Sequence, residues 1–188
     1  MAENTRRNGF LNSTALQAYT LLFAILMSSN TLAQTSFDEQ FDEENKPWQE
    51  IAIQLPPAPL PVDLLPFYVS ATATQVFALD EKSLSIGTDG VLRFTLVTTS
   101  RAGARNVDYE GIRCSSFERK MYAIGRSDGA WIRARQDQWA PIVNDAMNRQ
   151  QAALAKDYFC AGSSISGSRD DILRRLRRHD TLTGELTR

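Results

Sequence analysis

The stretch SLSIGTDGVLRFTLVTT, residues 83–99, decides how this chain folds. It places Asp89 and Gly90 between two runs that are rich in β-branched and large apolar residues. An Asp-Gly pair suits the positive φ values of a two-residue type I′ turn, so the stretch predicts a β-hairpin. In the second run, Leu92, Phe94 and Leu96 alternate with polar residues, which is the pattern of a strand buried on one face.

A second hairpin is predicted at Ser127-Asp128-Gly129, which separates the runs RKMYAIGR and AWIRAR. Two further strand-like runs are QVFALD (residues 75–80) and VDYEGIRC (residues 107–114). Strands that follow one another through short turns pair antiparallel. We therefore expect an antiparallel sheet of about five to seven strands.

The pattern changes to that of a helix after Trp139. Pro141 suits the first helical position, where its missing N–H has no intrahelical partner to lose. Apolar residues then recur along one broad stripe: Ile142, Val143, Ala146, Met147, Ala153, Leu154 and Tyr158. Gly162 can end the helix in a left-handed conformation. These residues predict one long helix packed on the sheet, and hence an α+β domain.

The C-terminal segment, residues 162–188, is predicted to be a flexible joint followed by a short arginine-rich helix. Ser168 and Asp171 have the spacing of a capping box before DILRRLRRH. We expect its four arginines to form a solvated tail, and a contact with anionic lipid or phosphate is the alternative.

The first 33 residues have the layout of a secretory signal peptide. Arg6 and Arg7 precede the ten apolar residues AYTLLFAILM, and a small-residue stretch ends at Ala33. Ten residues are fewer than the roughly 20 that a membrane-spanning helix needs. We expect cleavage after Ala33, export to the periplasm or outer cell envelope, and no transmembrane span after cleavage. An uncleaved N-terminal anchor is the alternative.

An acidic and proline-rich segment, residues 34–62, is predicted to form a flexible extended arm. Its larger apolar side chains are expected to anchor it to the domain or to contact a partner: Phe37, Phe41, Trp48 and Ile51. Without residues 1–33 the chain keeps a net charge of about −2, which argues against general nucleic-acid binding.

The two cysteines, Cys114 and Cys160, predict a disulfide in an exported protein. Cys160 lies eighteen residues, or five helical turns, after Ile142, so both would point toward the sheet. Cys114 shares a strand face with Ile112. Closing a loop of about 47 residues would stabilise the fold by about 4 kcal/mol. The spacing excludes a Cys-x-x-Cys redox pair, and the chain lacks further ligands for zinc.

Three carboxylates, Asp108, Glu110 and Glu118, raise the hypothesis of a glycosidase, because paired carboxylates can divide acid and base roles. The favoured interpretation is that Glu110 or Asp108 pairs with an arginine on a neighbouring strand, with these candidates: Arg93, Arg105 and Arg113. A buried Glu–Arg pair that binds a small polar ligand is a second alternative.

The sequence gives little support for other catalytic or binding sites. The single histidine, His179, lies in the arginine-rich helix, which disfavours a Ser-His-Asp or Cys-His site, and no cofactor or metal site is expected. Four aromatic residues could line a carbohydrate-binding face, but on strands they more often pack in a core: Tyr109, Tyr122, Trp131 and Trp139. We expect any ligand at a surface formed by Glu110, Arg113 and Trp131, with no catalytic residue assigned.

The order of the motifs resembles the CNP-one-like family, a group of uncharacterised exported proteins of Gram-negative bacteria. The resemblance rests on Trp48, LPPAPLP, SLSIGTDGVLRFTLV, YEGIRC, KMYAIGRSDGAW and DYFC, and it covers about Trp48 to Cys160. It implies a single envelope domain that contains both cysteines, and it supplies no catalytic residues.

The predicted organisation is a signal peptide (1–33), an arm (34–62), an α+β domain (63–161), and a joint with a tail helix (162–188). The expected function is a non-catalytic structural, binding or interaction protein of the cell envelope, with an envelope protein or a small polar ligand as its partner. The alternatives are a small cell-wall hydrolase that uses Asp and Glu residues, and a membrane-associated protein.

Overall fold

The structure is a computed structural model that describes residues 47–143, 145 and 148–184. The chain divides into two units, Met1–Trp48 and Gln49–Arg188, and the fold is that of the second unit. The predicted signal peptide and the predicted anchors Phe37 and Phe41 lie outside the described residues.

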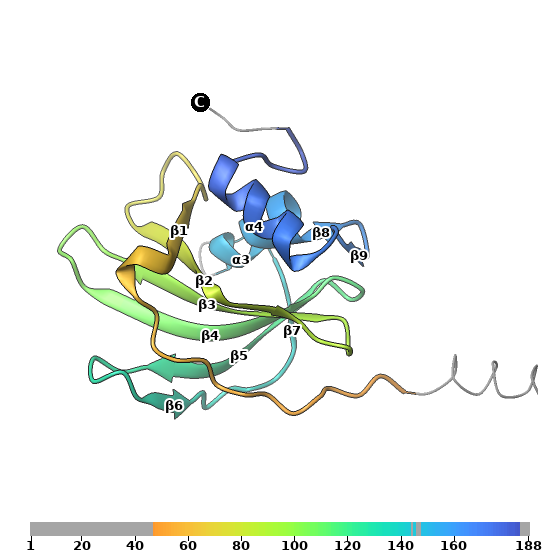
Figure 1. Ribbon diagram of the computed structural model, residues 1–188, viewed down its shortest axis with the longest axis horizontal. Coiled ribbons are helices and arrows are strands. Elements are labelled where there is room, and N and C mark those ends of the chain that lie inside the picture. The colour runs from red at the N-terminus through yellow and green to blue at the C-terminus, as the bar shows by residue number, and fades with distance from the viewer. Residues whose placement is uncertain (1–46, 144, 146–147, 185–188) are drawn as a thin grey trace, which may run out of the picture. The chain divides into compact units, whose positions relative to one another are not determined.

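A seven-stranded antiparallel sheet forms the body of this unit, which confirms the predicted sheet (Figure 1). Six strands follow one another in chain order across the sheet, and β7 pairs with β5 beyond the end of β6. The strands are β1 (Leu64–Phe67), β2 (Val76–Ile86), β3 (Val91–Thr99), β4 (Arg105–Arg113), β5 (Glu118–Gly125), β6 (Trp131–Arg133) and β7 (Ala140–Pro141). The short helix η1 (Pro61–Asp63) leads into β1.

Both predicted hairpins are confirmed, but the predicted type I′ turn is wrong. In the β2–β3 turn the Gly87 N–H donates to the Val91 carbonyl, and the Gly90 N–H donates to the Gly87 carbonyl. This is a three-residue loop in which only the last residue has a positive φ. Gly90, Gly103 and Gly129 hold that position in the β2–β3, β3–β4 and β5–β6 hairpins, with φ of 73°, 80° and 84°. Only a residue without Cβ adopts this conformation at little steric cost.

Strand β3 is buried on both faces, whereas its alternation predicted one buried face. Leu92 and Phe94 face the helices, and Arg93 faces the other way beneath the extended segment, which comprises residues 49–60. Figure 1 shows this segment, in orange, crossing the sheet on the side away from α3 and α4. The extended segment covers the face of β3 that lies away from the helices, which explains why this polar face is buried.

The predicted long helix is wrong. Pro141 lies in β7 opposite Glu118, and the Ile142 N–H donates to the Phe117 carbonyl, so the chain continues along the edge of β5. Proline is tolerated on such an edge strand because it has no N–H to pair. The helix starts only at α3 (Arg149–Ala153) and widens into the π-helical turn η2 (Leu154–Phe159).

The main core lies between the sheet and the helical layer. Phe94 packs edge-on against Phe159 with ring centres 5.2 Å apart, and Phe67 packs against Tyr158 at 6.4 Å. The predicted disulfide between Cys114 and Cys160 is confirmed, with Cα atoms 5.5 Å apart.

The predicted geometric reason for this disulfide is wrong, because no continuous helix carries Ile142 and Cys160 on one face. Cys160 instead starts the short strand β8 (Cys160–Ala161), which pairs with β9 (Ser164–Ile165) directly after η2. Burial of both sulfurs in one core brings them together.

The arginine-rich helix α4 (Arg169–Arg178) packs in the same core through Ile172, Leu173 and Leu176. Its predicted capping box is present at Ser168 and Asp171. We expected its arginines to form a solvated tail, whereas its apolar side chains are buried in the main core.

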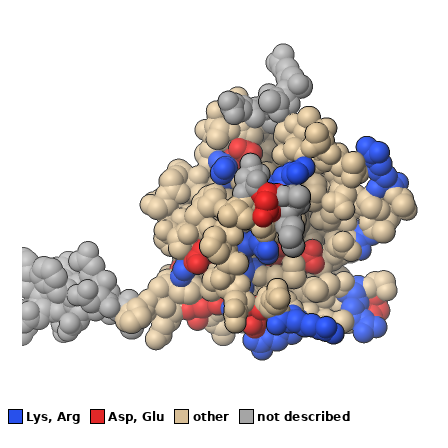
Figure 2. Space-filling view, turned by 180° about the vertical axis from the view of Figure 1, so that it is seen from behind, with Lys and Arg blue, Asp and Glu red and all other residues tan. Residues whose placement is uncertain are grey.

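The arginines at the two ends of α4 bind the rest of the domain. The Arg169 guanidinium donates to the carbonyls of Leu84 and Glu81 at 2.7 and 2.6 Å, and Arg177 pairs with the Glu81 carboxylate at 2.6 Å. Figure 2 shows Lys and Arg side chains interspersed with Asp and Glu on the face that it draws. Among the described residues, no helix has both the length and the apolar character for crossing a membrane.

Candidate functional site

The first attachment of the extended segment to the sheet is the carboxylate of Glu50. The Tyr122 hydroxyl donates to it at 2.5 Å, the Lys120 ammonium at 2.9 Å and the Trp139 indole N–H at 3.3 Å. The Arg93 guanidinium lies 3.5 Å away. Burial by itself raises the pKa of Glu50, but the bonds from Tyr122 and Lys120 outweigh it, so the pKa lies below its ordinary value.

A second attachment lies one residue further along. Arg93 binds both oxygens of Asp89, at 3.0 and 2.5 Å, and the Ile51 N–H donates to Asp89 at 3.1 Å. The Ile51 side chain itself is exposed, so this predicted anchor acts through its backbone. The segment is therefore fixed by polar contacts where the sequence predicted apolar ones.

Beneath the segment lies a small aromatic cluster. The Tyr109 ring centre is 5.6 Å from that of Tyr122 and 6.0 Å from that of Trp131. Trp131 donates its indole N–H to the Pro56 carbonyl at 2.7 Å. Gly111 makes room for this packing, because a Cβ at that position would lie 2.6 Å from the Tyr122 hydroxyl oxygen. These aromatics pack together as predicted for core residues.

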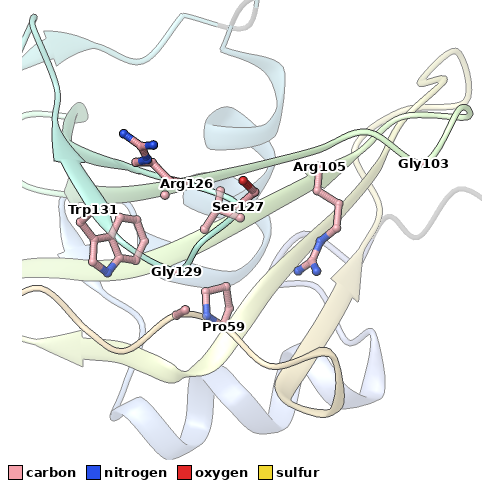
Figure 3. Close-up of a pocket in the computed structure, with 10 residues that line it drawn as sticks. Pro59, Gly103, Arg105, Arg126, Ser127, Gly129 and Trp131 are labelled. Atoms are coloured by element: carbon pink, nitrogen blue, oxygen red, sulfur yellow. The ribbon is translucent and has the colours of Figure 1, made fainter.

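The candidate site is a cavity of about 400 Å³ beside this cluster, which we call the Trp131 pocket (Figure 3). The β3–β4 and β5–β6 turns, adjacent parts of β4, β5 and β6, and the extended segment form its walls. Its lining residues are Ala58, Pro59, Gly103, Arg105, Val107, Gly125, Arg126, Ser127, Gly129 and Trp131. Because Ala58 and Pro59 belong to the extended segment, that segment forms part of the pocket wall.

Figure 3 shows Trp131 and Arg105 on opposite sides of the pocket, with Pro59 and Ser127 between them. The Arg126 guanidinium points away from Pro59 in this view, and its Nε lies 3.4 Å from the Asp128 carboxylate. The floor is tight, since a Cβ on Gly125 would lie 3.0 Å from the Val107 side chain. The site thus combines an indole, two guanidinium groups and a hydroxyl over an apolar floor.

The three residues predicted to form one ligand surface lie apart. Glu110 is opposite Phe94 on the helix-facing side of the sheet. Arg113 lies on the other side, where it pairs with Glu118 and stacks on Trp139 at 5.3 Å. Of the three, only Trp131 lines the pocket.

Glu110 is buried, and its carboxylate accepts two bonds from the Gln151 amide at 2.9 and 3.0 Å. The predicted pairing of Glu110 with Arg93, Arg105 or Arg113 is therefore replaced by a neutral partner from α3. Burial raises the pKa of Glu110 to about 7, although the Gln151 bond opposes the change. Burial likewise raises the pKa of Asp108.

The proposed hydrolase carboxylates do not converge on a cavity. Glu110 is 1% exposed, and Glu118 is engaged with Arg113 and Ser116 on a different part of the sheet. Within the described part of the chain, no group of three or more His, Cys, Asp or Glu side chains is placed to hold a metal ion.

Sequence reasoning missed Glu50, because nothing in a run of acidic residues distinguishes the one that the sheet binds. It also missed the pocket, although its signal is visible: three Gly-containing turns recur along the sheet, and glycine at a turn tip leaves the adjoining space open.

These features define a disulfide-bonded α+β domain built on an antiparallel meander, with an N-terminal segment that completes a surface pocket. The chain belongs to the CNP1-like (CNP-one-like) family, whose match spans residues 43–177. The match includes the extended segment and nearly all of α4, and so reaches beyond Cys160. No curated protein and no solved structure matches the chain.

Proposed function

We propose that this protein is an exported, non-catalytic binding module of the cell envelope that holds a small polar ligand in the Trp131 pocket. One observation carries the proposal: the pocket of about 400 Å³ is lined by an aromatic ring, two arginines and a hydroxyl group. Pockets that bind small molecules have volumes of about 300–1,000 Å³ and combine apolar walls with a few polar groups.

Two features support binding over catalysis. The carboxylate with the most raised pKa, Glu110, is enclosed between β4 and α3, away from the pocket. The pocket lining contains no carboxylate, histidine or cysteine, and its single hydroxyl, on Ser127, has no base beside it among the lining residues. A general acid or base must reach the reacting atom directly or through one water.

Two features support export. The first 33 residues have the charge and hydropathy layout of a signal peptide. The disulfide between Cys114 and Cys160 is of a kind that persists in oxidising compartments.

The export part is tested by fractionating an expressing Gram-negative bacterium and measuring the intact mass of the protein. The expected result is a periplasmic species that begins at Gln34 with both cysteines oxidised. A cytoplasmic species of full length with free thiols contradicts export.

The binding part is tested by NMR with the purified, disulfide-bonded protein and a panel of small polar probes, namely glucose, N-acetylglucosamine, glucose 1-phosphate and glutamate. Bound probes should shift the Trp131 indole N–H signal, and Trp131→Phe should weaken binding. Ile132→Ala is the matched control, because Ile132 is exposed on the neighbouring position of β6 and does not line the pocket. Equal loss in both variants, or no shift with any probe, contradicts a ligand site here.

A further inference from the structure

The Trp131 pocket has a strongly one-sided charge. Of its ten lining residues, two are arginines and none is acidic. Arg126 is paired with Asp128, which does not line the pocket, just as Arg93 is paired with Asp89 and Lys120 with Glu50 elsewhere on this side of the sheet. A site with two guanidinium groups and no carboxylate in its lining favours a negatively charged occupant.

Arg105 is the cation that faces the pocket most directly. It is an exposed residue at the start of β4, and Figure 3 places its side chain across from Trp131. The planar guanidinium presents paired N–H donors that match the oxygens of phosphate, sulfate or carboxylate groups.

Arg126 is a second, adjustable cation. Its contact with Asp128 is 3.4 Å long, and both side chains are more than half exposed. Exposed ion pairs of this kind contribute about 0–1 kcal/mol, so a ligand anion can compete for the guanidinium. The Ser127 hydroxyl, on the adjacent residue, is a further donor that lines the pocket.

Trp131 provides an apolar surface for the uncharged part of the ligand. Its indole N–H is already bonded to the Pro56 carbonyl, so the ring offers the pocket an apolar surface and not a donor. A flat apolar surface fixed in orientation packs well against the face of a sugar or aromatic ring. The lining therefore separates a ring-binding side from an anion-binding side.

We propose that the pocket binds an oxyanion carried on a ring, with the ring packed on Trp131 and the phosphate, sulfate or carboxylate group held by Arg105 and Ser127, while Arg126 adds a second positive charge nearby. This inference rests on the proposed binding function and names the ligand class for the same site. The anion belongs either to a soluble molecule or to a lipid headgroup, since both present the same chemistry.

The test compares matched probes by NMR titration of the purified, disulfide-bonded protein: phenyl phosphate against benzyl alcohol, and glucose 1-phosphate against glucose. The charged member of each pair should bind at least about tenfold more tightly, as expected for charge-assisted bonds. Arg105→Gln should remove most of this difference, and Arg105→Lys should remove part of it. Arg101→Gln is the control, because Arg101 is exposed in the same hairpin turn and does not line the pocket.

The outcomes separate the two proposals. Equal affinity for charged and neutral probes, with Trp131→Phe still weakening both, overturns the oxyanion and leaves the binding function standing. Equal effects of Arg105→Gln and Arg101→Gln also overturn it. No binding of any probe, soluble or on vesicles, overturns both proposals.

A vesicle arm identifies the source of the anion. Phosphatidylinositol vesicles, in which the phosphate is carried on a polyhydroxylated ring, are compared with phosphatidylcholine vesicles by co-sedimentation. Binding to the anionic vesicles that is lost in Arg105→Gln supports a lipid headgroup. Binding to soluble charged probes without vesicle binding supports a soluble ligand.

Discussion

Replacing Glu110 with glutamine should stabilise the protein at neutral and alkaline pH, which is unusual for a change in a buried strand. Burial raises the pKa of this carboxyl from its ordinary 4.5 to about 7. Each factor of ten in proton affinity corresponds to about 1.4 kcal/mol, so ionised Glu110 destabilises the folded state by about 3 kcal/mol. Glutamine keeps the shape and can bond Gln151 without acquiring a charge.

The direction of the pH dependence follows from where the proton is held. Between pH 4.5 and 7 the folded protein holds the Glu110 proton and the unfolded chain releases it, so stability falls as pH rises through this range. The groups that act on the carboxyl are Gln151, Asp108 and Arg119, and all three remain in the variant. The difference between Glu110→Gln and the original protein should therefore be small below pH 4.5 and reach about 3 kcal/mol above pH 7.

The assay is urea unfolding of the disulfide-bonded protein at half-unit steps from pH 4 to pH 8.5. Glu118→Gln serves as the control, because bonds from Ser116 and Arg113 hold the pKa of Glu118 below its ordinary value. The stability that Glu118 contributes is lost as pH falls. The stability of Glu118→Gln relative to the original protein should therefore decrease as pH rises, whereas that of Glu110→Gln should increase. A Glu110→Gln variant that gains nothing at pH 8, or gains equally at every pH, would refute the reasoning.

Three further predictions concern the same frame. Glu50→Gln should lower the free energy of unfolding by about 1–3 kcal/mol at pH 7 and by less at pH 4, because the pKa of Glu50 is lowered and its stabilisation is lost as pH falls. Urea unfolding midpoints at the two pH values check this, and equal losses at both would contradict it. Replacing Cys114 and Cys160 together with alanine should lower the free energy of unfolding by about 4 kcal/mol, measured by urea unfolding, and a loss below about 1 kcal/mol would contradict a constraining crosslink. Gly111→Ala should lower the free energy of unfolding by about 1–3 kcal/mol, because its Cβ would displace Tyr122 and loosen the extended segment. The urea midpoint and the NMR amide signal of residue 51 report this change. If neither changes, the close packing of Gly111 against Tyr122 is contradicted.

The sheet was predictable from sequence because its signals are local. The glycine-containing turns and the alternation in β3 and β4 each act within a few residues, and they locate β2 to β6. The runs QVFALD and SLSI form the single strand β2, and β1 and β7 were not predicted. The turn type was not predictable, because Asp-Gly suits both a two-residue loop and the end of a three-residue loop.

The helical layer was harder to predict because its boundaries depend on tertiary pairing. The stripe from Ile142 onward has helical spacing, yet the edge of β5 captures residues 140–142 first. In α4, four arginines suggested a helix exposed to solvent. The packing of the helix is instead set by its apolar residues Ile172, Leu173 and Leu176, which are buried in the core. A count of charges conceals an apolar stripe on a short helix.

The candidate site was only partly predictable. Trp131 was predicted to contact a ligand and does line the pocket, whereas its neighbours there come from turns and from a segment more than 70 residues earlier. Strand alternation alone could have separated Glu110 from Arg113, since the two differ by an odd number of positions. No local signal joins Pro59 to Trp131, because their proximity depends on where Glu50 is bound.

The binding of Glu50 also orders events in time. Translation delivers this residue early, but Lys120, Tyr122 and Trp139 follow it by 70, 72 and 89 positions. Until those partners emerge and pair into a sheet, the first-made part of the site has nothing to dock on. Glu50 can dock only after β5, which carries Lys120 and Tyr122, has paired in the sheet, so its docking follows hairpin formation. A folding molecule should thus acquire its strands first, and the part of the pocket wall that the extended segment supplies should be added last.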